Sequence, residues 1–276
     1  MEFTNKLALL LITTQAEYES GLVDKCIKNF LSKEVSLSHK IDLHIYFNVG
    51  KEFTYATLNK YSSLDVVNKI FINILNLSKV EDLYCRTPKD FKNLKSRSDL
   101  ELGGSSGPNN LFYRSFENLF SSEYRDILLI ETDCFPVKKY WLDHVIEYCD
   151  NNKFLISGST YKGKVKLAPF QIWTGHLNGV AIYRNSLFLK TFIRKSKQLI
   201  KHEIHNKVSN FISFDVAMHK VYSTLFGRKH CHDPKVPENH LLDCNIISNF
   251  SLPEDKNTPI ESVIKQYPET IILHKK

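Results

Sequence analysis

Two acidic residues, Glu131 and Asp133, directly follow the apolar run Ile127–Ile130. This run is typical of a strand that is covered on both faces, and Pro136 ends the pattern before a helix expected to begin near Lys138. In open α/β sheets, ligands bind beyond the carboxyl ends of the strands. Carboxylates at positions i and i+2 of an extended chain point the same way, so both could bind one divalent cation. The alternative is an ordinary acidic turn in which Asp133 caps the next helix.

Three further segments combine small and polar residues beside an expected strand or helix. They are Thr13–Gln15 after the first strand, Gly103–Asn109 before a helix, and Trp173–Gly179 before a strand. Polar side chains there can hydrogen-bond a base or a sugar, and glycines let the backbone approach a ligand. Each segment also has a structural interpretation: a helix cap in the first, a flexible loop in the second and a hairpin turn in the third.

Asp215 lies inside the apolar arc of a helix expected over Ser209–Leu225. At about 100° per residue, Phe211, Met218 and Tyr222 fall within about 60° of it. A lone charge in that arc is costly, so we expect a buried carboxylate with a raised pKa, which suits a general base. The alternative is a structural ion pair with His219, one turn on, or with a basic neighbour.

The elements that must position these residues follow from the hydrophobic pattern. Strands are expected at Leu7–Thr13, Ile41–Phe47, Ile70–Leu75, Ile127–Ile130, Phe154–Ser157, Val180–Tyr183 and Thr270–Leu273, and helices at Tyr18–Lys33, Asn110–Phe120, Lys139–Cys149, Ser186–Ile200 and Ser209–Leu225. Such alternation predicts an α/β fold with a mostly parallel sheet flanked by helices. No internal repeat or linker interrupts it, so we expect residues 1–276 to form a single domain.

Composition narrows the class of protein further. The chain of 276 residues is 42% hydrophobic and 24% charged, which predicts a sizeable packed core and excludes a disordered chain. No apolar run approaches the roughly 20 residues that cross a bilayer, and the N-terminus does not resemble a secretory signal. We therefore expect a cytoplasmic protein with reduced, mostly buried cysteines.

The net charge of +7 includes basic stretches at Lys89–Arg97 and Arg194–Lys207. These stretches are either solvated faces or attract an anion such as a nucleotide diphosphate, an acidic polymer or a membrane surface. No helix-turn-helix, zinc-finger or aromatic RNA-binding pattern occurs, so no nucleic-acid partner is expected. The cluster His230-Cys231-His232, with His240 nearby, lacks the paired spacing of a structural zinc site.

The stretch Glu131-Thr132-Asp133 resembles the D-x-D region of GT-A-fold glycosyltransferases, in which an apolar strand ends in acids and a proline and an aromatic-rich helix follow. Other segments are similar to that family in the same order along the chain. They are Thr13, Thr14 and Gln15; Asn109; His176, Asn178 and Gly179; the helix segment Phe214–Ala217; and His274 at the end of the last strand.

The resemblance implies a Rossmann-like GT-A domain, with a nucleotide-sugar half at about residues 1–137 and an acceptor half at about residues 138–276. It implies that Asp133 and His274 hold Mn²⁺ or Mg²⁺ on the donor diphosphate. Glu131 would meet this ion, a metal-bound water or the ribose. Thr13, Thr14, Gln15, Asn109, Thr132, His176, Asn178 and Gly179 would contact the nucleotide sugar.

The activity that the resemblance implies is metal-dependent transfer of a sugar from a nucleotide-diphosphate sugar to an acceptor hydroxyl. Asp215 would act as the base if the configuration of the sugar is inverted. The acceptor would be a soluble glycan or a lipid-linked glycan reached by peripheral contact with a membrane. Two alternatives are a metal-dependent phosphohydrolase or nucleotidyltransferase, and a glycan- or nucleotide-binding module without turnover.

Overall fold

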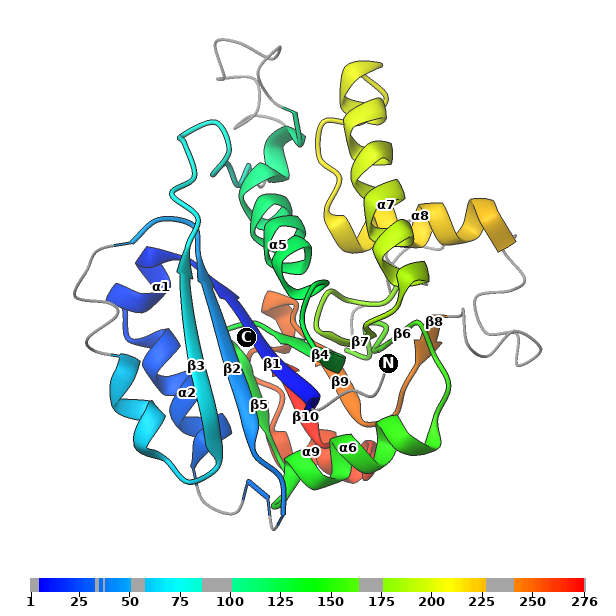
Figure 1. Cartoon of the computed structure of the whole chain (residues 1–276). Helices are drawn as coiled ribbons and strands as arrows, with labels where there is room; N and C mark the ends of the chain where they lie inside the picture. Colours follow the sequence, from blue (N-terminus) through cyan, green and yellow to red (C-terminus); the bar gives the residue numbers. More distant parts are fainter. Residues whose placement is uncertain are drawn as a thin grey trace.

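A seven-stranded sheet forms the centre of the computed structural model, which describes residues 5–32, 35–36, 38–50, 58–85, 101–163, 176–226 and 241–275 (Figure 1). Its strands are β1 (Asn5–Thr13), β2 (Ile41–Phe47), β3 (Val67–Ile74), β4 (Tyr124–Ile130), β6 (Ile156–Gly158), β7 (Ala181–Arg184) and β8 (Leu241–Asp243), in the order β3-β2-β1-β4-β7-β6-β8. Strands β3, β2, β1 and β4 run parallel, β7 is antiparallel to β4 and β6, and β6 and β8 are parallel. The prediction of a mostly parallel sheet is confirmed.

Helices cover both faces of this sheet. They are α1 (Gln15–Glu19), α2 (Leu22–Leu31), α5 (Ser106–Leu119), α6 (Trp141–Asn151), α7 (Leu187–His205) and α8 (Phe214–Phe226). In β1, Leu7, Leu9 and Leu11 join the hydrophobic cluster that contains side chains of α2 and α6, whereas Ala8, Leu10 and Ile12 join the cluster of α5, α7 and α8. Because alternate side chains of a strand face opposite ways, β1 is buried on both sides, which explains its nearly continuous apolar sequence.

A smaller sheet brings the end of the chain back to the turn after β4. It contains β5 (Cys134–Pro136), β9 (Ile247–Phe250) and β10 (Ile272–Lys275), with β10 in the middle. Strand β10 is antiparallel to β5 and pairs His274 with Cys134, and it is parallel to β9. The short helix α9 (Ile260–Gln266) contributes Val263 to a cluster with Phe250 and Leu273. The C-terminal strand is thereby fixed beside the acids that follow β4.

Three expected boundaries were wrong for local reasons. The helix expected over Tyr18–Lys33 is two helices, because Gly21 between them adopts a left-handed backbone with φ +80°. The helix expected from Ser209 begins at Phe214. The segment expected as a loop before residue 110 is a 3-10 turn, Gly103–Ser105, followed directly by α5.

Aromatic packing joins α5 to α8, the helix that carries Asp215. The rings of Phe112 and Phe214 stack with centroids 4.0 Å apart and planes 7° apart. Phe112 is fully buried and also contacts Phe116 and Tyr183. The position of Asp215 therefore depends on this cluster, since Phe214 is its neighbour in the chain.

None of the helices in the described part of the chain combines the length and the apolar character that a membrane span requires.

Replacing Phe112 with alanine is expected to lower the free energy of unfolding by about 3–5 kcal/mol, because it leaves a cavity under α5. The matched control is Phe71→Ala, since Phe71 is 38% exposed and its loss should cost only about 1 kcal/mol. Chemical denaturation followed by circular dichroism measures both values. Equal losses in the two variants would contradict the assignment of Phe112 to the core.

Candidate active site

The acidic motif lies on a tight turn, not on an extended strand. Strand β4 ends at Ile130, and the backbone N–H of Cys134 donates to the carbonyl of Glu131 at 3.1 Å, which closes a four-residue turn. The prediction that Glu131 and Asp133 share one side of an extended chain is therefore corrected. The turn is held from the other side by β10, where the N–H of Lys275 donates to the carbonyl of Asp133 at 3.1 Å.

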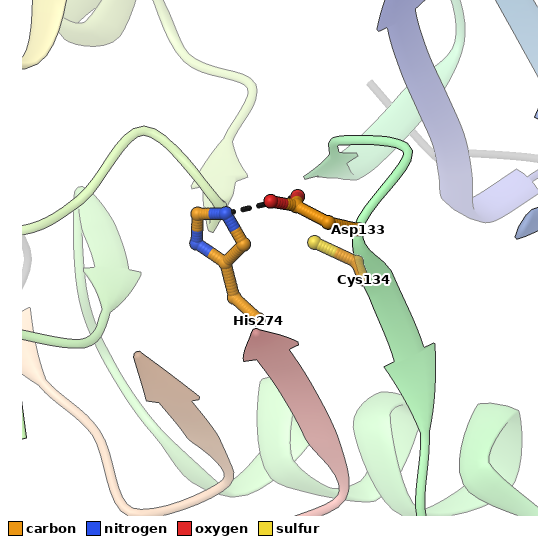
Figure 2. A group of neighbouring side chains, drawn as sticks. All are labelled: Asp133, Cys134 and His274. Atoms are coloured by element: carbon orange, nitrogen blue, oxygen red, sulfur yellow. Dashed lines mark ion pairs between the residues drawn. The ribbon is translucent and has the colours of Figure 1, made fainter. Parts of the chain in front are cut away.

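The turn and β10 bring Glu131, Asp133 and His274 together. Nε2 of His274 lies 3.1 Å from Oδ1 of Asp133 and 3.5 Å from Oε2 of Glu131. Figure 2 shows the imidazole and the Asp133 carboxylate facing one another, with Cys134 beside them. The imidazole is 2% exposed, whereas the side chains of Asp133 and Glu131 are 24% and 39% exposed. The cluster is thus shielded from solvent at His274 and accessible to solvent at the two acids.

Electrostatics at this cluster favour a positive charge between the two acids. Burial by itself would lower the pKa of His274, but the close approach of the Asp133 and Glu131 carboxylates and their negative charges raises this pKa to about 9. Burial raises the pKa of the Cys134 thiol well above its usual value, and the nearby acids add to that effect. Cys134 is therefore a neutral thiol at physiological pH.

The donor atoms of this cluster fit a hard divalent cation. Asp133, Cys134 and His274 each offer a ligand atom within 4.8 Å of the others. Neither ring nitrogen of His274 makes a hydrogen bond of good geometry with the described residues, although Nε2 faces both acids. Carboxylate oxygens with one imidazole suit Mn²⁺ or Mg²⁺, whereas a protonated thiol is a poor ligand.

Glu17 connects the end of β1 to the acidic turn. Its carboxylate accepts hydrogen bonds from Oγ1 of Thr13 at 3.0 Å and from N and Oγ1 of Thr14 at 2.9 and 3.0 Å. Its second oxygen accepts from Oγ1 of Thr132 at 2.8 Å. The sequence analysis missed Glu17, yet the spacing of Thr14 and Glu17 matches a helix capping box, which the structure contains at the start of α1.

A second polar connection lies behind Gln15. The backbone N–H of Gln15 donates to Oδ1 of Asn48 at 2.9 Å, and Nδ2 of Asn48 donates to Oδ2 of Asp82 at 2.7 Å. Asn48 directly follows β2 and is 6% exposed. It therefore ties the ends of the first two strands to the segment before α5. No sequence pattern marked Asn48 or Asp82.

Asn109 has a structural role that differs from the predicted ligand contact. It is fully buried in the first turn of α5, and its Nδ2 donates to the carbonyls of Leu102 at 3.3 Å and Ile212 at 2.9 Å. The side chain thus fastens α5 to the segment that precedes α8. The prediction began this helix at Asn110, four residues after its observed start at Ser106, and therefore placed Asn109 in the preceding loop.

The segment predicted to bind the sugar is described from His176 onward, and Trp173, Thr174 and Gly175 lie outside the described residues. Oδ1 of Asn178 accepts from the N–H of Val180 at 2.9 Å, so its side chain shapes the turn into β7. Gly179 lies against Phe214, where a Cβ atom would come within 2.5 Å of the ring. The close approach of β7 and α8 therefore requires glycine at this position.

Asp215 meets His176 across the fold. Nε2 of His176 lies 3.4 Å from Oδ2 of Asp215, and the two side chains are 9% and 13% exposed. The other carboxylate oxygen accepts from the hydroxyl of Ser213 and from the N–H of Val216. A cavity of about 10 Å³ adjoins Asp215, and His219 also lines it.

The predicted raised pKa of Asp215 is wrong. Burial alone would raise it, but the hydrogen bond and charge of His176, with the bonds from Ser213 and Val216, lower the pKa below its usual value. The side chain of Asp215 is 13% exposed, and its partner comes from a distant segment. The cluster of His230, Cys231, His232 and His240 lies outside the described residues, as does the basic stretch Lys89–Arg97.

Comparison with known proteins gives the fold. No family model matches the chain, and no curated protein matches it in sequence. Among solved structures, apo mouse xyloside xylosyltransferase 1 is similar with a TM-score of 0.54 and 13% identity, over 98% of this chain and 97% of that chain. The apo glycosyltransferase GlyE of Streptococcus pneumoniae is similar with a TM-score of 0.50 and 13% identity, over 98% of this chain and 54% of GlyE. The chain therefore has the GT-A fold.

Replacing Glu17 with alanine is expected to lower the free energy of unfolding by about 1–2 kcal/mol, because the capping box of α1 loses its acceptor. Glu19→Ala, in the same helix, is the control and should change stability by no more than about 0.5 kcal/mol, since Glu19 is exposed. Denaturation measures the difference, and hydrogen exchange at the Thr14 amide locates it. Unchanged exchange at Thr14 in Glu17→Ala would show that the network has no such role.

The pairing of Asp215 predicts an acid-dependent loss of stability. The pKa of Asp215 is lower in the folded state, so the unfolded chain binds more protons at acidic pH. The contribution of Asp215 to the free energy of unfolding is therefore present above the unfolded pKa near 3.8 and is lost as the pH falls further. We expect the unfolding free energy to fall more steeply with acidification below about pH 4 in the wild type than in Asp215→Asn. Urea denaturation across this range measures both slopes, and parallel slopes would contradict the assignment.

Proposed function

We propose that this chain is a glycosyltransferase that uses a nucleotide-diphosphate sugar as donor and depends on Mn²⁺ or Mg²⁺. The acceptor we propose is a hydroxyl group of a glycan or of a lipid-linked glycan. The observation that carries the proposal is the meeting of Glu131, Asp133 and His274 at one edge of a GT-A fold. The similarity to two glycosyltransferase structures supports this class of reaction over others of the same architecture.

Asp133 and His274 would hold the cation, with Glu131 as a third ligand or as a partner of a metal-bound water or of the ribose. The exposure of the two acids, beside the buried imidazole, leaves room for phosphate oxygens on the open side. When bound, the ion would offset the negative charge that develops on the leaving diphosphate.

The nucleotide would lie at the end of β1, beside Thr13, Thr14 and Gln15. Glu17 supports this arrangement, because it accepts from two of these residues and from Thr132 in the acidic turn. Because the carboxylate of Glu17 already accepts hydrogen bonds from these residues, we assign it a role in positioning them. The neighbouring residues would make the direct contacts with the nucleotide. We assign His176 and the turn at Asn178 and Gly179 to the sugar side of the site.

Asp215 would take the proton of the acceptor hydroxyl if the reaction inverts the sugar. Its lowered pKa keeps it ionised at neutral pH, so it is ready to accept a proton, although it is a weaker base than a carboxylate with a raised pKa. His176 would hold the carboxylate in place through the contact at 3.4 Å.

A donor panel separates this proposal from the alternatives. The full chain is incubated with UDP-, GDP- and CMP-sugars, with Mn²⁺ or with chelator, and release of nucleotide and transfer to glycan acceptors are scored. Metal-dependent turnover of one sugar nucleotide supports the proposal. Turnover of nucleoside triphosphates or simple phosphoesters without a requirement for sugar would instead indicate a phosphohydrolase or nucleotidyltransferase, and donor binding without turnover would indicate a binding module.

Replacing Asp133 with alanine is expected to lower kcat by about 100-fold or more and to weaken Mn²⁺ binding, because it removes a cation ligand and charge stabilisation. His274→Ala should weaken Mn²⁺ binding as well. Cys134→Ala is the matched control: its neutral thiol is not a ligand in this proposal, so metal affinity should be retained. Calorimetric titration with Mn²⁺ reads out binding without turnover. Full activity in a folded Asp133→Ala would refute the metal assignment.

A further inference from the structure

A second pocket lies between α5 and α7. Its apolar walls are Tyr113 and Phe120 from the α5 side and Ile193 from α7, and its volume is about 100 Å³. The two helices are fastened here by a hydrogen bond of 3.1 Å between Tyr113 Oη and Ser196 Oγ, and they stand next to one another in Figure 1. A cavity of this size is far below the roughly 300–1,000 Å³ that encloses a whole drug-sized ligand, so it suits a small group such as a phosphate.

Three cationic side chains of α7 line this pocket: Lys190, Arg194 and Lys197. The pocket is also lined by one acid, Glu117, which pairs with Lys197 at 2.9 Å; Lys197 lies 5.6 Å from the centre of the Tyr113 ring. The side chains of Lys190 and Arg194 make no ion pair or hydrogen bond with any residue in the described ranges. The pocket therefore has an excess of positive charge that this part of the fold does not neutralise.

The pocket lies on a stripe of α7 that ends in an exposed leucine. At about 100° per residue, Leu187, Lys190, Arg194 and Lys197 fall within about 80° of the helix circumference. Leu187 is 81% exposed, the largest exposed fraction among the large hydrophobic side chains of the described residues. Cations beside an exposed apolar side chain are the pattern of a surface that contacts anionic lipid.

We propose that the α5–α7 pocket binds the phosphate of an anionic lipid headgroup, with Leu187 entering the bilayer beside it. The charge of Lys190 and Arg194 complements a phosphate, and Leu187 distinguishes a lipid from a soluble anion. The pocket lies toward the start of β4, because Phe120 precedes that strand, whereas Asp133 follows its end. Strand β4 has seven residues and is about 23 Å long. The proposal goes beyond the sugar transfer proposed above.

Co-sedimentation with vesicles tests the proposal on the full chain. Vesicles of phosphatidylcholine alone are compared with vesicles of phosphatidylcholine mixed with phosphatidylglycerol. We expect binding to the anionic vesicles only, with an affinity that falls as salt is raised. Equal binding to both kinds of vesicle, or binding to neither, would overturn the proposal.

Charge-neutralising variants locate the site. Lys190→Gln combined with Arg194→Gln is expected to weaken vesicle binding by about 25-fold, from about fivefold for each lost cation. Leu187→Ser should weaken it by about tenfold. The matched control is Lys25→Gln combined with Lys265→Gln, which removes the same charge from exposed positions on α2 and α9 and should change binding little.

A titration with inorganic phosphate distinguishes a lipid headgroup from free phosphate as the anion that the pocket binds. Inorganic phosphate is titrated against the full chain while amide shifts of α5 and α7 are recorded. Saturation at the pocket by phosphate, without binding to anionic vesicles, would overturn the lipid assignment. Loss of vesicle binding in the Lys190 and Arg194 double variant, with thermal stability retained, would support it. Failure of the donor panel leaves this readout unaffected.

Discussion

The contact of His274 with the Glu131–Asp133 turn is the constraint on which the candidate active site depends. The buried imidazole of His274 can face both carboxylates only if strand β10 returns to the turn that carries Glu131 and Asp133. The small sheet provides this return, since β10 lies between β5 and β9 and its backbone bonds to Asp133. Two neighbouring carboxylates repel one another, so the geometry is favourable only with a positive charge between them. A proton on His274 supplies that charge in the free protein, and a bound cation would supply it in the proposed enzyme.

The strongest elements of the fold could be predicted because their sequence carries the burial pattern directly. Strand β2 matches its predicted bounds, Ile41–Phe47, and the predicted run at Leu7 lies within β1. The short strands β5 and β9 were missed, because three or four residues do not establish a period and their pairing is made by the distant β10. Boundaries also moved where one backbone angle decides the structure, as at Gly21.

In the candidate site, too, residues with a local sequence signal could be predicted, and residues defined by contacts between distant segments could not. The acids could be identified because they follow an apolar strand, whereas the role of the terminal histidine came from the resemblance to GT-A glycosyltransferases. Glu17 has a local signal in its spacing from Thr14, whereas Asn48 and Asp82 have none, because their bonds connect segments far apart in the sequence. The pKa of Asp215 illustrates the consequence. Burial can be predicted from one helix, but the sign of the shift depends on His176, which only the tertiary fold brings near.

Positive charge is concentrated on helix α7, and negative charge is exposed at the turn that carries Glu131 and Asp133. Helix α7 carries five cationic side chains (Lys190, Arg194, Lys195, Lys197 and Lys201), and its only acid, Glu203, is buried and paired with Lys220. The acidic turn, by contrast, exposes its carboxylates at the other end of β4. An anionic surface would therefore attract α7 and repel the acids, which fixes the orientation of approach. A membrane held at α7 would leave the acidic edge facing away from it. A lipid-linked acceptor would then have to extend its glycan past the sheet, whereas a soluble donor could reach the acids freely.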